Sequence, residues 1–137
     1  MATEDKRHLD NRFPMARYEF ATQTYPMTAA DALSPTLNDV CGTIMAIEII
    51  ISDTQDGITY TVAITTENSA TLFLEATMID NTKHWRDAES DKNPRDADFN
   101  SIPVNGALTA TITPIVAPDN ASVGTKTATV QVILYIK

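Results

Sequence analysis

The sequence predicts an all-β protein, built as an antiparallel β-sandwich. Threonine accounts for 20 of the 137 residues and recurs in alternation with valine, isoleucine and leucine. β-Branched residues pack well on a pleated sheet and lose rotamer freedom in a helix. Several segments alternate polar and apolar residues with a period of two, and turn residues separate them. A chain of this length is expected to form one domain.

The N-terminal third differs from the rest of the chain. Residues 1–41 contain three prolines and few sustained patterns, so we expect an extended N-terminal arm that crosses a surface. Residues 17–25 alternate briefly and predict a short strand with Tyr18 and Phe20 on one face. Residues 42–137 are expected to form the β-sandwich domain.

Five segments of the domain have strand patterns. Residues 44–52 are largely apolar on both sides, which predicts a strand covered on both faces. Residues 58–65 alternate in the way of a half-buried antiparallel strand. The strands expected after these are residues 70–80, where a helix also fits the pattern, and then 106–117 and 125–136.

Turn signals suggest how these strands connect. The Asp-Gly pair that ends residues 53–57 is typical of a hairpin between the first two strands, and the last two strands are expected to form a second hairpin. Residues 81–105 are expected to be irregular, and a connection this long is usually functional or mobile. Five to seven strands without a sizeable helix predict an immunoglobulin-like or jelly-roll sandwich.

Charge and targeting signals exclude several classes of protein. The net charge of −8 argues against a nucleic-acid surface, which needs a basic stripe. Residues 1–17 carry +1 and the remainder −9, so the arm either docks on an acidic surface or is a solvated tail. We expect no signal peptide, no membrane span and no membrane partner. Cys41 is the only cysteine, which favours maturation in a reducing cytosol.

The chain lacks the residues of a recognisable catalytic site. Its two histidines, His8 and His84, lie outside any recognised motif, although serine or cysteine catalysis normally needs a histidine base. Cys41 is expected to be an idle thiol or a small apolar filler. No glycine-rich phosphate loop is present. We expect no enzyme activity, no catalytic residues and no cofactor.

A possible calcium loop lies within residues 81–105. Oxygen-bearing side chains alternate over residues 87–93, which is how a loop wraps calcium. Lys92, however, lies where the calcium loop of helix–loop–helix proteins requires glycine, and Pro94 stiffens the next turn. We therefore expect no metal site at the residues considered, which are Asp87, Glu89, Asp91, Asn93 and Asp98.

Aromatic residues suggest contact surfaces. Trp85, the only tryptophan, lies between His84 and Arg86, and tryptophan and arginine are enriched at interface hot spots. The alternative is that Trp85 folds back as a lid over the open end of the sandwich. Apolar residues also interrupt the polar row of the last strand, which predicts a homo-oligomer. The candidate contacts with a capsid or another subunit are Phe13, Tyr18, Phe20, Tyr25, Trp85, Arg86, Ile133 and Tyr135.

The strand segments GTIMAIEIIIS, GITYTVAITT, FNSIPVNGALTATITP and TATVQVILYIK occur in this order. Together they resemble small β-sandwich virion proteins of tailed bacteriophages, most nearly the head decoration, or cement, proteins. The resemblance covers about residues 42–137 and contains no fixed motif, so no binding residue is carried over. It implies a symmetric homo-oligomer, often a trimer, that binds the outside of a phage head and stabilises it.

The partner implied by this resemblance is the major capsid protein or another virion protein. The location implied is the virion, after synthesis in the host cytoplasm. A different class of protein also fits the residues, namely a carbohydrate- or receptor-binding β-sandwich module that uses the 81–105 loop and Trp85. Neighbouring genes for capsid, portal or protease proteins would favour the virion function over the carbohydrate-binding one.

Overall fold

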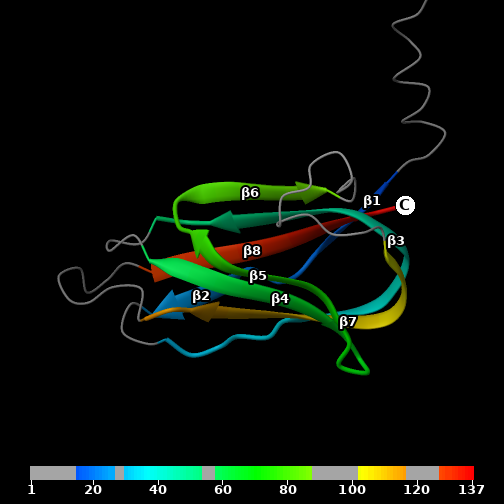
Figure 1. The fold of residues 1–137 in the computed structure, drawn as a ribbon, viewed down its shortest axis with the longest axis horizontal. Helices are drawn as coiled ribbons and strands as arrows, with labels where there is room; N and C mark the ends of the chain where they lie inside the picture. The colour runs from blue at the N-terminus through cyan, green and yellow to red at the C-terminus, as the bar shows by residue number, and fades with distance from the viewer. Residues whose placement is uncertain (1–14, 27–29, 54–57, 88–101, 117–126) are drawn as a thin grey trace, which may run out of the picture.

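A computed structural model describes residues 15–26, 30–53, 58–87, 102–116 and 127–137 of the chain (Figure 1). These residues form eight strands whose pairings are all antiparallel, and they include no helix. The prediction of an all-β antiparallel fold is confirmed. The strands are β1 (Ala16–Glu19), β2 (Gln23–Pro26), β3 (Thr36–Ile51), β4 (Thr59–Thr66), β5 (Thr71–Ile79), β6 (Thr82–Asp87), β7 (Ile102–Pro114) and β8 (Thr127–Ile136).

Two long strands, β3 and β7, are shared by two layers. The first part of β3 pairs with β7, and its second part pairs with β8 on one side and β6 on the other. The first layer therefore has the order β6-β3-β8, and both β1 and β2 lie along the outer side of β8. The second layer has the order β5-β4-β7. Figure 1 shows β3 and β7 curving round one end of the molecule to join the layers.

Glycines lie at the bend in each shared strand. Gly42 and Gly106 have φ angles of 135° and 133°, in a region that side-chain-bearing residues rarely adopt. A Cβ atom on Gly42 would also lie 2.5 Å from Cγ2 of Ile136 and 2.8 Å from the carbonyl oxygen of Lys137. The absence of a side chain at Gly42 therefore permits both the bend of β3 and the close approach of the C-terminal residues.

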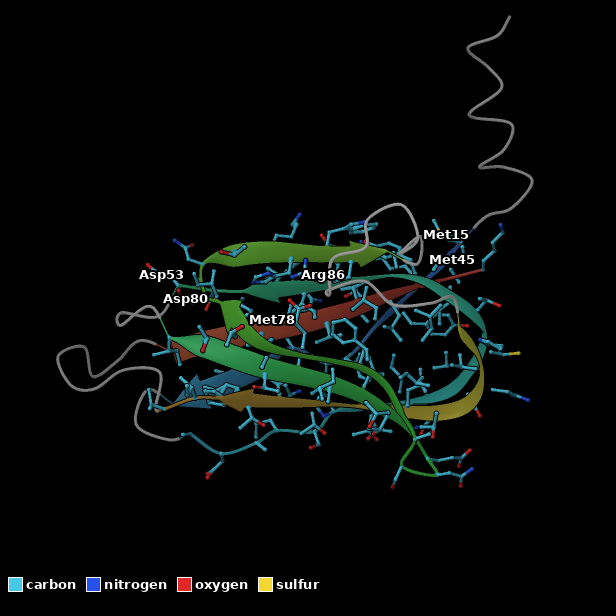
Figure 2. The ribbon with its side chains drawn as sticks, in the orientation of Figure 1. Met15, Met45, Asp53, Met78, Asp80 and Arg86 are labelled. Carbon is cyan, nitrogen blue, oxygen red and sulfur yellow. The ribbon has the colours of Figure 1, made fainter. Side chains whose placement is uncertain are left out.

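Aliphatic side chains from both layers fill the space between them (Figure 2). In the first layer, Ile47, Ile49 and Ile51 of β3 face the second layer, because a strand alternates the direction of its side chains. A register shift after Ile44 places that residue inward, in the position that simple alternation assigns to Met45. On the opposite side of β3, Ala46 and Glu48 are buried, whereas Ile50 is partly exposed. The prediction of a strand covered on both faces therefore holds only in part, because this side is an outer surface that neighbouring side chains partly cover.

Two buried tyrosines contact each other between the layers. The Tyr25 and Tyr60 rings meet edge to face with centroids 5.8 Å apart. The Tyr25 hydroxyl donates a hydrogen bond to the Ile112 carbonyl oxygen, whereas within the described residues the Tyr60 hydroxyl has no hydrogen-bond partner. Burial raises the pKa of Tyr25 to about 12 and also raises the pKa of Tyr60 above its ordinary value.

Both predicted hairpins are wrong. Strand β4 pairs with β5 and β7 but not with β3, and β8 pairs with β1, β2 and β3 but not with β7. In each case the two successive strands lie in different layers. The Asp-Gly turn residues lie outside the described part of the chain. Turn residues are a local signal, whereas the pairing of these strands is decided by apolar surfaces from distant segments.

Residues 81–105 are less irregular than predicted. Strand β6 occupies residues 82–87 and β7 begins at residue 102, while residues 88–101 lie outside the described part. The sequence Lys83-His84-Trp85-Arg86 does not alternate polar and apolar residues. It forms a strand at the edge of a layer, where polar side chains have partners on both faces.

Strands also occur within the predicted N-terminal arm. Strands β1 and β2 pair with β8, and β3 begins at Thr36, so the expected boundary at residue 42 falls inside β3. The single strand expected over residues 17–25 is two short strands separated by residues 20–22, of which Phe20 is buried. Residues 1–14 are outside the described part.

Candidate protein-binding face

The outer side of the first layer holds an aromatic surface. Glu48 of β3 lies between Trp85 of β6 and Ile133 of β8 in the strand register, and Tyr135 is two residues beyond Ile133. Lys83 lies two residues before Trp85 on β6 and therefore has the same orientation. We call this surface the Trp85 face and define it by Glu48, Lys83, Trp85, Ile133 and Tyr135.

A buried carboxylate lies beneath the exposed side chains of the Trp85 face. Glu48 is only 7% exposed, and its Oε1 accepts a 2.9 Å hydrogen bond from the Tyr135 hydroxyl. The Lys83 Nζ lies 3.4 Å from its Oε2. A buried charge is costly unless it is paired and hydrogen-bonded, and Glu48 is both. The bond to Glu48 raises the pKa of Tyr135 above its ordinary value and fixes the position of the ring.

The Trp85 ring packs against Tyr135, whose hydroxyl is bound to this carboxylate. The two rings lie 5.3 Å apart, centroid to centroid, at an interplanar angle of 46°. Even so, 48% of the Trp85 surface is exposed. The side chain lies on the outer side of β6, next to Tyr135, and is not a lid over the end of the sandwich. The result is a large, partly exposed ring whose orientation is held by its neighbours.

Polar residues border the Trp85 face along β1 and β8. The Arg17 Nε lies 3.0 Å from Oε2 of Glu19, and the Gln131 side-chain amide donates a 3.0 Å hydrogen bond to Oε1 of Glu19. Because β1 pairs with β8 opposite Ile133 and Tyr135, these side chains lie beside the aromatic pair. An apolar centre with a polar border is the usual anatomy of a protein-binding surface.

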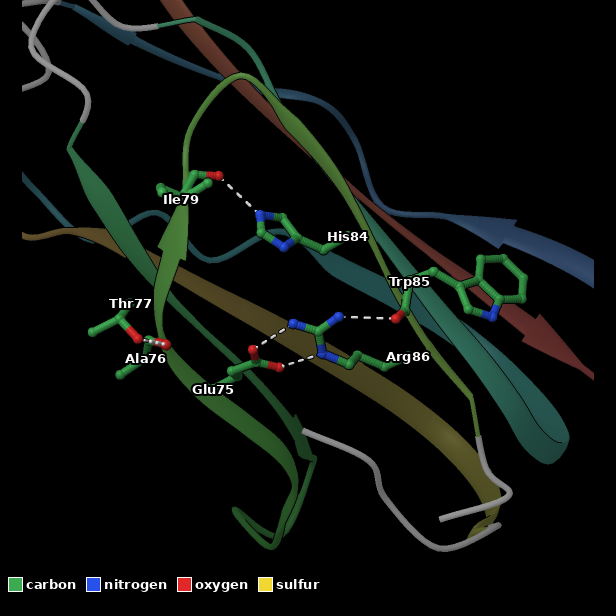
Figure 3. Close-up of polar contacts among 7 residues, drawn as sticks. All are labelled: Glu75, Ala76, Thr77, Ile79, His84, Trp85 and Arg86. Atoms are coloured by element: carbon green, nitrogen blue, oxygen red, sulfur yellow. Dashed lines mark hydrogen bonds and ion pairs between the residues drawn. The ribbon is translucent and has the colours of Figure 1, made fainter. Parts of the chain in front are cut away.

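The neighbours of Trp85 on β6 face the other way, toward β5 (Figure 3). The Arg86 guanidinium donates two hydrogen bonds to the Glu75 carboxylate, at 2.7 and 2.6 Å. The His84 Nε2 lies 2.8 Å from the Ile79 carbonyl oxygen. Together they join the edge strands of the two layers. Arg86, a predicted contact residue, is therefore engaged within the chain.

The structure divides the other predicted contact residues into two groups. Phe20, Tyr25 and Ile133 are at most 1% exposed and cannot present their side chains to a partner in this conformation. Tyr18 packs against the core, while Phe13 lies outside the described residues. Only Trp85 and Tyr135 of the predicted set come together at the surface.

The sequence predictions missed Glu48 and Lys83 as parts of this surface. One signal was present, since Glu48 is the only charged residue in the apolar run 44–51. A charge on a strand that is covered on both faces needs a partner. The sequence does not identify that partner, because Tyr135 is 87 residues away along the chain.

Other kinds of site have little support in the described residues. No group of three or more potential metal ligands occurs there, but the residues considered for calcium fall outside the part whose side chains are described. The Cys41 thiol is free and exposed. In the described ranges there is also no helix that is long and apolar enough to span a membrane.

Comparisons with known proteins give only weak likenesses. No protein-family model matches the chain, and no curated protein matches its sequence. Among solved structures, the chain is similar to one in particles derived from infectious bursal virus with T=1 symmetry, with a TM-score of 0.44 and 11% identity. The similarity covers 90% of this chain and 32% of that one, so the chain spans about a third of the viral protein's length.

A second similar structure is the SPBc2 prophage-derived protein YomS. The TM-score is 0.41 and the identity 12%, over 88% of this chain and 95% of YomS. The VP2 subviral particle of infectious bursal disease virus gives a TM-score of 0.43 at 10% identity. At these TM-scores we draw no function from any of the three likenesses.

Proposed function

We propose that this chain is a non-enzymatic structural protein of a virion, which decorates a phage head by binding the capsid surface through the Trp85 face. The observation that carries the proposal is the exposed Trp85 ring held against Tyr135. The resemblance of the strand segments to head decoration proteins supports the choice of a virion as the setting.

The charges of the Trp85 face favour a protein partner. Lys83 neutralises Glu48, and Arg17 neutralises Glu19, so the surface around the ring is balanced although the chain carries −8 overall. Burying an exposed tryptophan against a partner gains free energy from its large apolar area. Polar residues at the border exclude water from such a centre, as they do around interface hot spots.

The test is binding of the full chain to virus particles. The chain is mixed with particles of the phage that encodes it and run through a density gradient. It should sediment with the major capsid protein. Trp85→Ala should weaken binding about thirtyfold or more, the effect of losing a hot-spot contact of about 2 kcal/mol. Leu74→Ala is the matched control, because Leu74 is also an exposed apolar residue but lies on β5 of the second layer. A chain that stays free of particles contradicts the proposal.

The Trp85 ring also favours a second function, the binding of a carbohydrate or a receptor glycan. An exposed ring next to a carboxylate can provide both an apolar surface and a hydrogen-bond acceptor. However, both Glu48 oxygens already have partners within the chain, which leaves the acceptor little free capacity. A glycan array decides between the two functions. Binding to one class of glycan that Trp85→Ala abolishes, together with no binding to particles, would establish the second.

A further inference from the structure

We propose that the edge of β6 that has no partner among the described strands pairs antiparallel with the β6 edge of a second copy of this chain. A two-fold axis through the contact would extend the first layer of each copy into one continuous sheet. The contact runs along one border of the Trp85 face and brings the two Trp85 side chains next to each other, because an added strand lies beside β6 in the plane of the sheet.

Strand β6 is the most regular open edge in the described part of the molecule. It pairs with β3 over six residues without a register shift. The edge strand of the second layer, β5, contains two register shifts and a left-handed residue, Thr77 with a φ of 60°. On the other side of the first layer, β1 and β2 are four residues each, and residues 20–22 separate them. Irregular and short edges resist the addition of a strand, whereas a regular edge accepts one.

The direction of the backbone groups of β6 follows from the pairing of β3. The Phe20 N–H donates to the Val132 carbonyl oxygen at 3.0 Å, so the even-numbered residues of β8 bond on the side of β1 and its odd-numbered residues bond to β3. The register of β3 with β8 then directs the even-numbered residues of this part of β3 toward β8. Bonding alternates along an antiparallel ladder, so the odd-numbered residues of β3 bond to β6. The register then directs the backbone N–H and C=O groups of Lys83 and Trp85 away from β3 and toward the open edge.

The inner side of β6 holds the strand in place. Arg86 is bound to Glu75 through two hydrogen bonds, and His84 contacts the Ile79 carbonyl oxygen. Both partners lie on β5, so β6 is attached to β3 by its backbone and to the second layer by its side chains. An edge that is already ordered loses little conformational entropy when it pairs.

A second copy fits this edge by charge. Two bodies of net charge −8 repel, but the cations of β6 are paired with Glu48 and Glu75, which leaves the edge nearly balanced. In an antiparallel register centred on Trp85, the two Trp85 residues lie opposite each other. Aromatic pairs across neighbouring strands stabilise pairing.

The experiment compares two substitutions of Lys83 in the full chain by light scattering. The wild type should have twice the 15.0 kDa mass of one chain, with reductant present because the Cys41 thiol is exposed. Lys83→Pro removes the outward N–H in both copies and should weaken dimerisation about tenfold or more. Lys83→Ala removes the same charge but keeps the N–H, and it should remain a dimer.

Tryptophan emission gives a second measurement that needs no variant. Trp85 is the only tryptophan, so its emission reports the β6 edge alone. Dilution of the wild type should shift the emission to longer wavelength at the concentration where the mass halves. A monomer at all concentrations, a trimer, or a dimer whose dissociation leaves the emission unchanged would each overturn the proposal. Equal dimerisation of folded Lys83→Pro and Lys83→Ala would overturn it as well.

Discussion

The two sides of the first layer are made by the same strands but differ in chemistry. On the inner side, β3 and β8 contribute isoleucine, valine and leucine side chains that are almost completely buried. On the outer side, the alternate residues of the same strands include Glu48, Gln131 and Tyr135, with Trp85 beside them on β6. The inner side stabilises the fold through apolar burial, whereas the outer side uses hydrogen bonds to hold an aromatic ring at the surface.

This difference indicates that stability and binding can be altered separately. A substitution on the inner side removes contacts that the folded chain needs. A substitution of the exposed ring on the outer side removes little that the fold depends on. The predictions below test this separation, starting with the largest expected effect.

The first prediction compares Ile49→Ala with Trp85→Ala. Ile49 is fully buried, so its truncation should lower the free energy of unfolding by about 3 kcal/mol. Trp85 is about half exposed, and its truncation should cost less than about 1 kcal/mol. Urea unfolding followed by circular dichroism measures both. Equal losses would show that the outer side is also part of the stabilising core.

The second prediction concerns the bends that join the layers. Gly42→Ala should lower the free energy of unfolding by about 2 kcal/mol, because the new Cβ has a strained φ and meets Ile136 and the Lys137 backbone. Gly106→Ala has the same strain, but its Cβ meets only the flexible end of Glu67 and should cost about 1 kcal/mol. Thermal unfolding of the two variants side by side tests the order, and a reversed order would refute it.

The third prediction uses the two tyrosines between the layers. Tyr25→Phe should cost about 1 kcal/mol through loss of the bond to Ile112. Tyr60→Phe should be neutral or stabilise the chain by up to about 1 kcal/mol, because its hydroxyl is buried without a partner among the described residues. A loss on Tyr60→Phe as large as that on Tyr25→Phe would mean that the Tyr60 hydroxyl is satisfied.

The fourth prediction is a dependence of stability on alkaline pH. The pKa of Tyr25 is about 12 in the folded chain and 10.0 as the ordinary value, so the unfolded chain loses this proton first. Its contribution to stability is complete below pH 10 and is lost as the pH rises toward 12. Between pH 9 and 11, the wild type should lose about 1 kcal/mol more than Tyr25→Phe. Parallel pH profiles for the two proteins would contradict this.

The regular strands could be predicted from the sequence because their signal is local. The alternation of Ile58, Tyr60, Val62 and Ile64 with threonine directly reflects a strand with one buried face, and all four side chains are buried in β4. The partners of each strand could not be predicted in the same way. Both faces of residues 44–51 are apolar, so the pattern does not indicate that this strand lies between β6 and β8.

The candidate site was predicted only in part for a similar reason. Trp85 stands out in the sequence as the only tryptophan, and Tyr135 as a residue that interrupts the polar row of the last strand, and the two rings meet. Phe20 and Tyr25 look equivalent in the sequence but are buried, because the segment that carries them lies along β8. Whether an aromatic residue faces a partner or the core depends on pairing over more than 100 residues of sequence.

The central position of β8 has a consequence for synthesis of the chain. Strand β8 comes after the seven other described strands in the sequence, yet it lies between β3 on one side and β1 and β2 on the other. Until the ribosome has released the residues up to Ile136, the first layer lacks its middle strand and those earlier strands have exposed edges. Folding that depends on such distant pairings is slow, and exposed strand edges invite aggregation. Rapid overexpression is therefore expected to yield more insoluble protein than slow expression at low temperature.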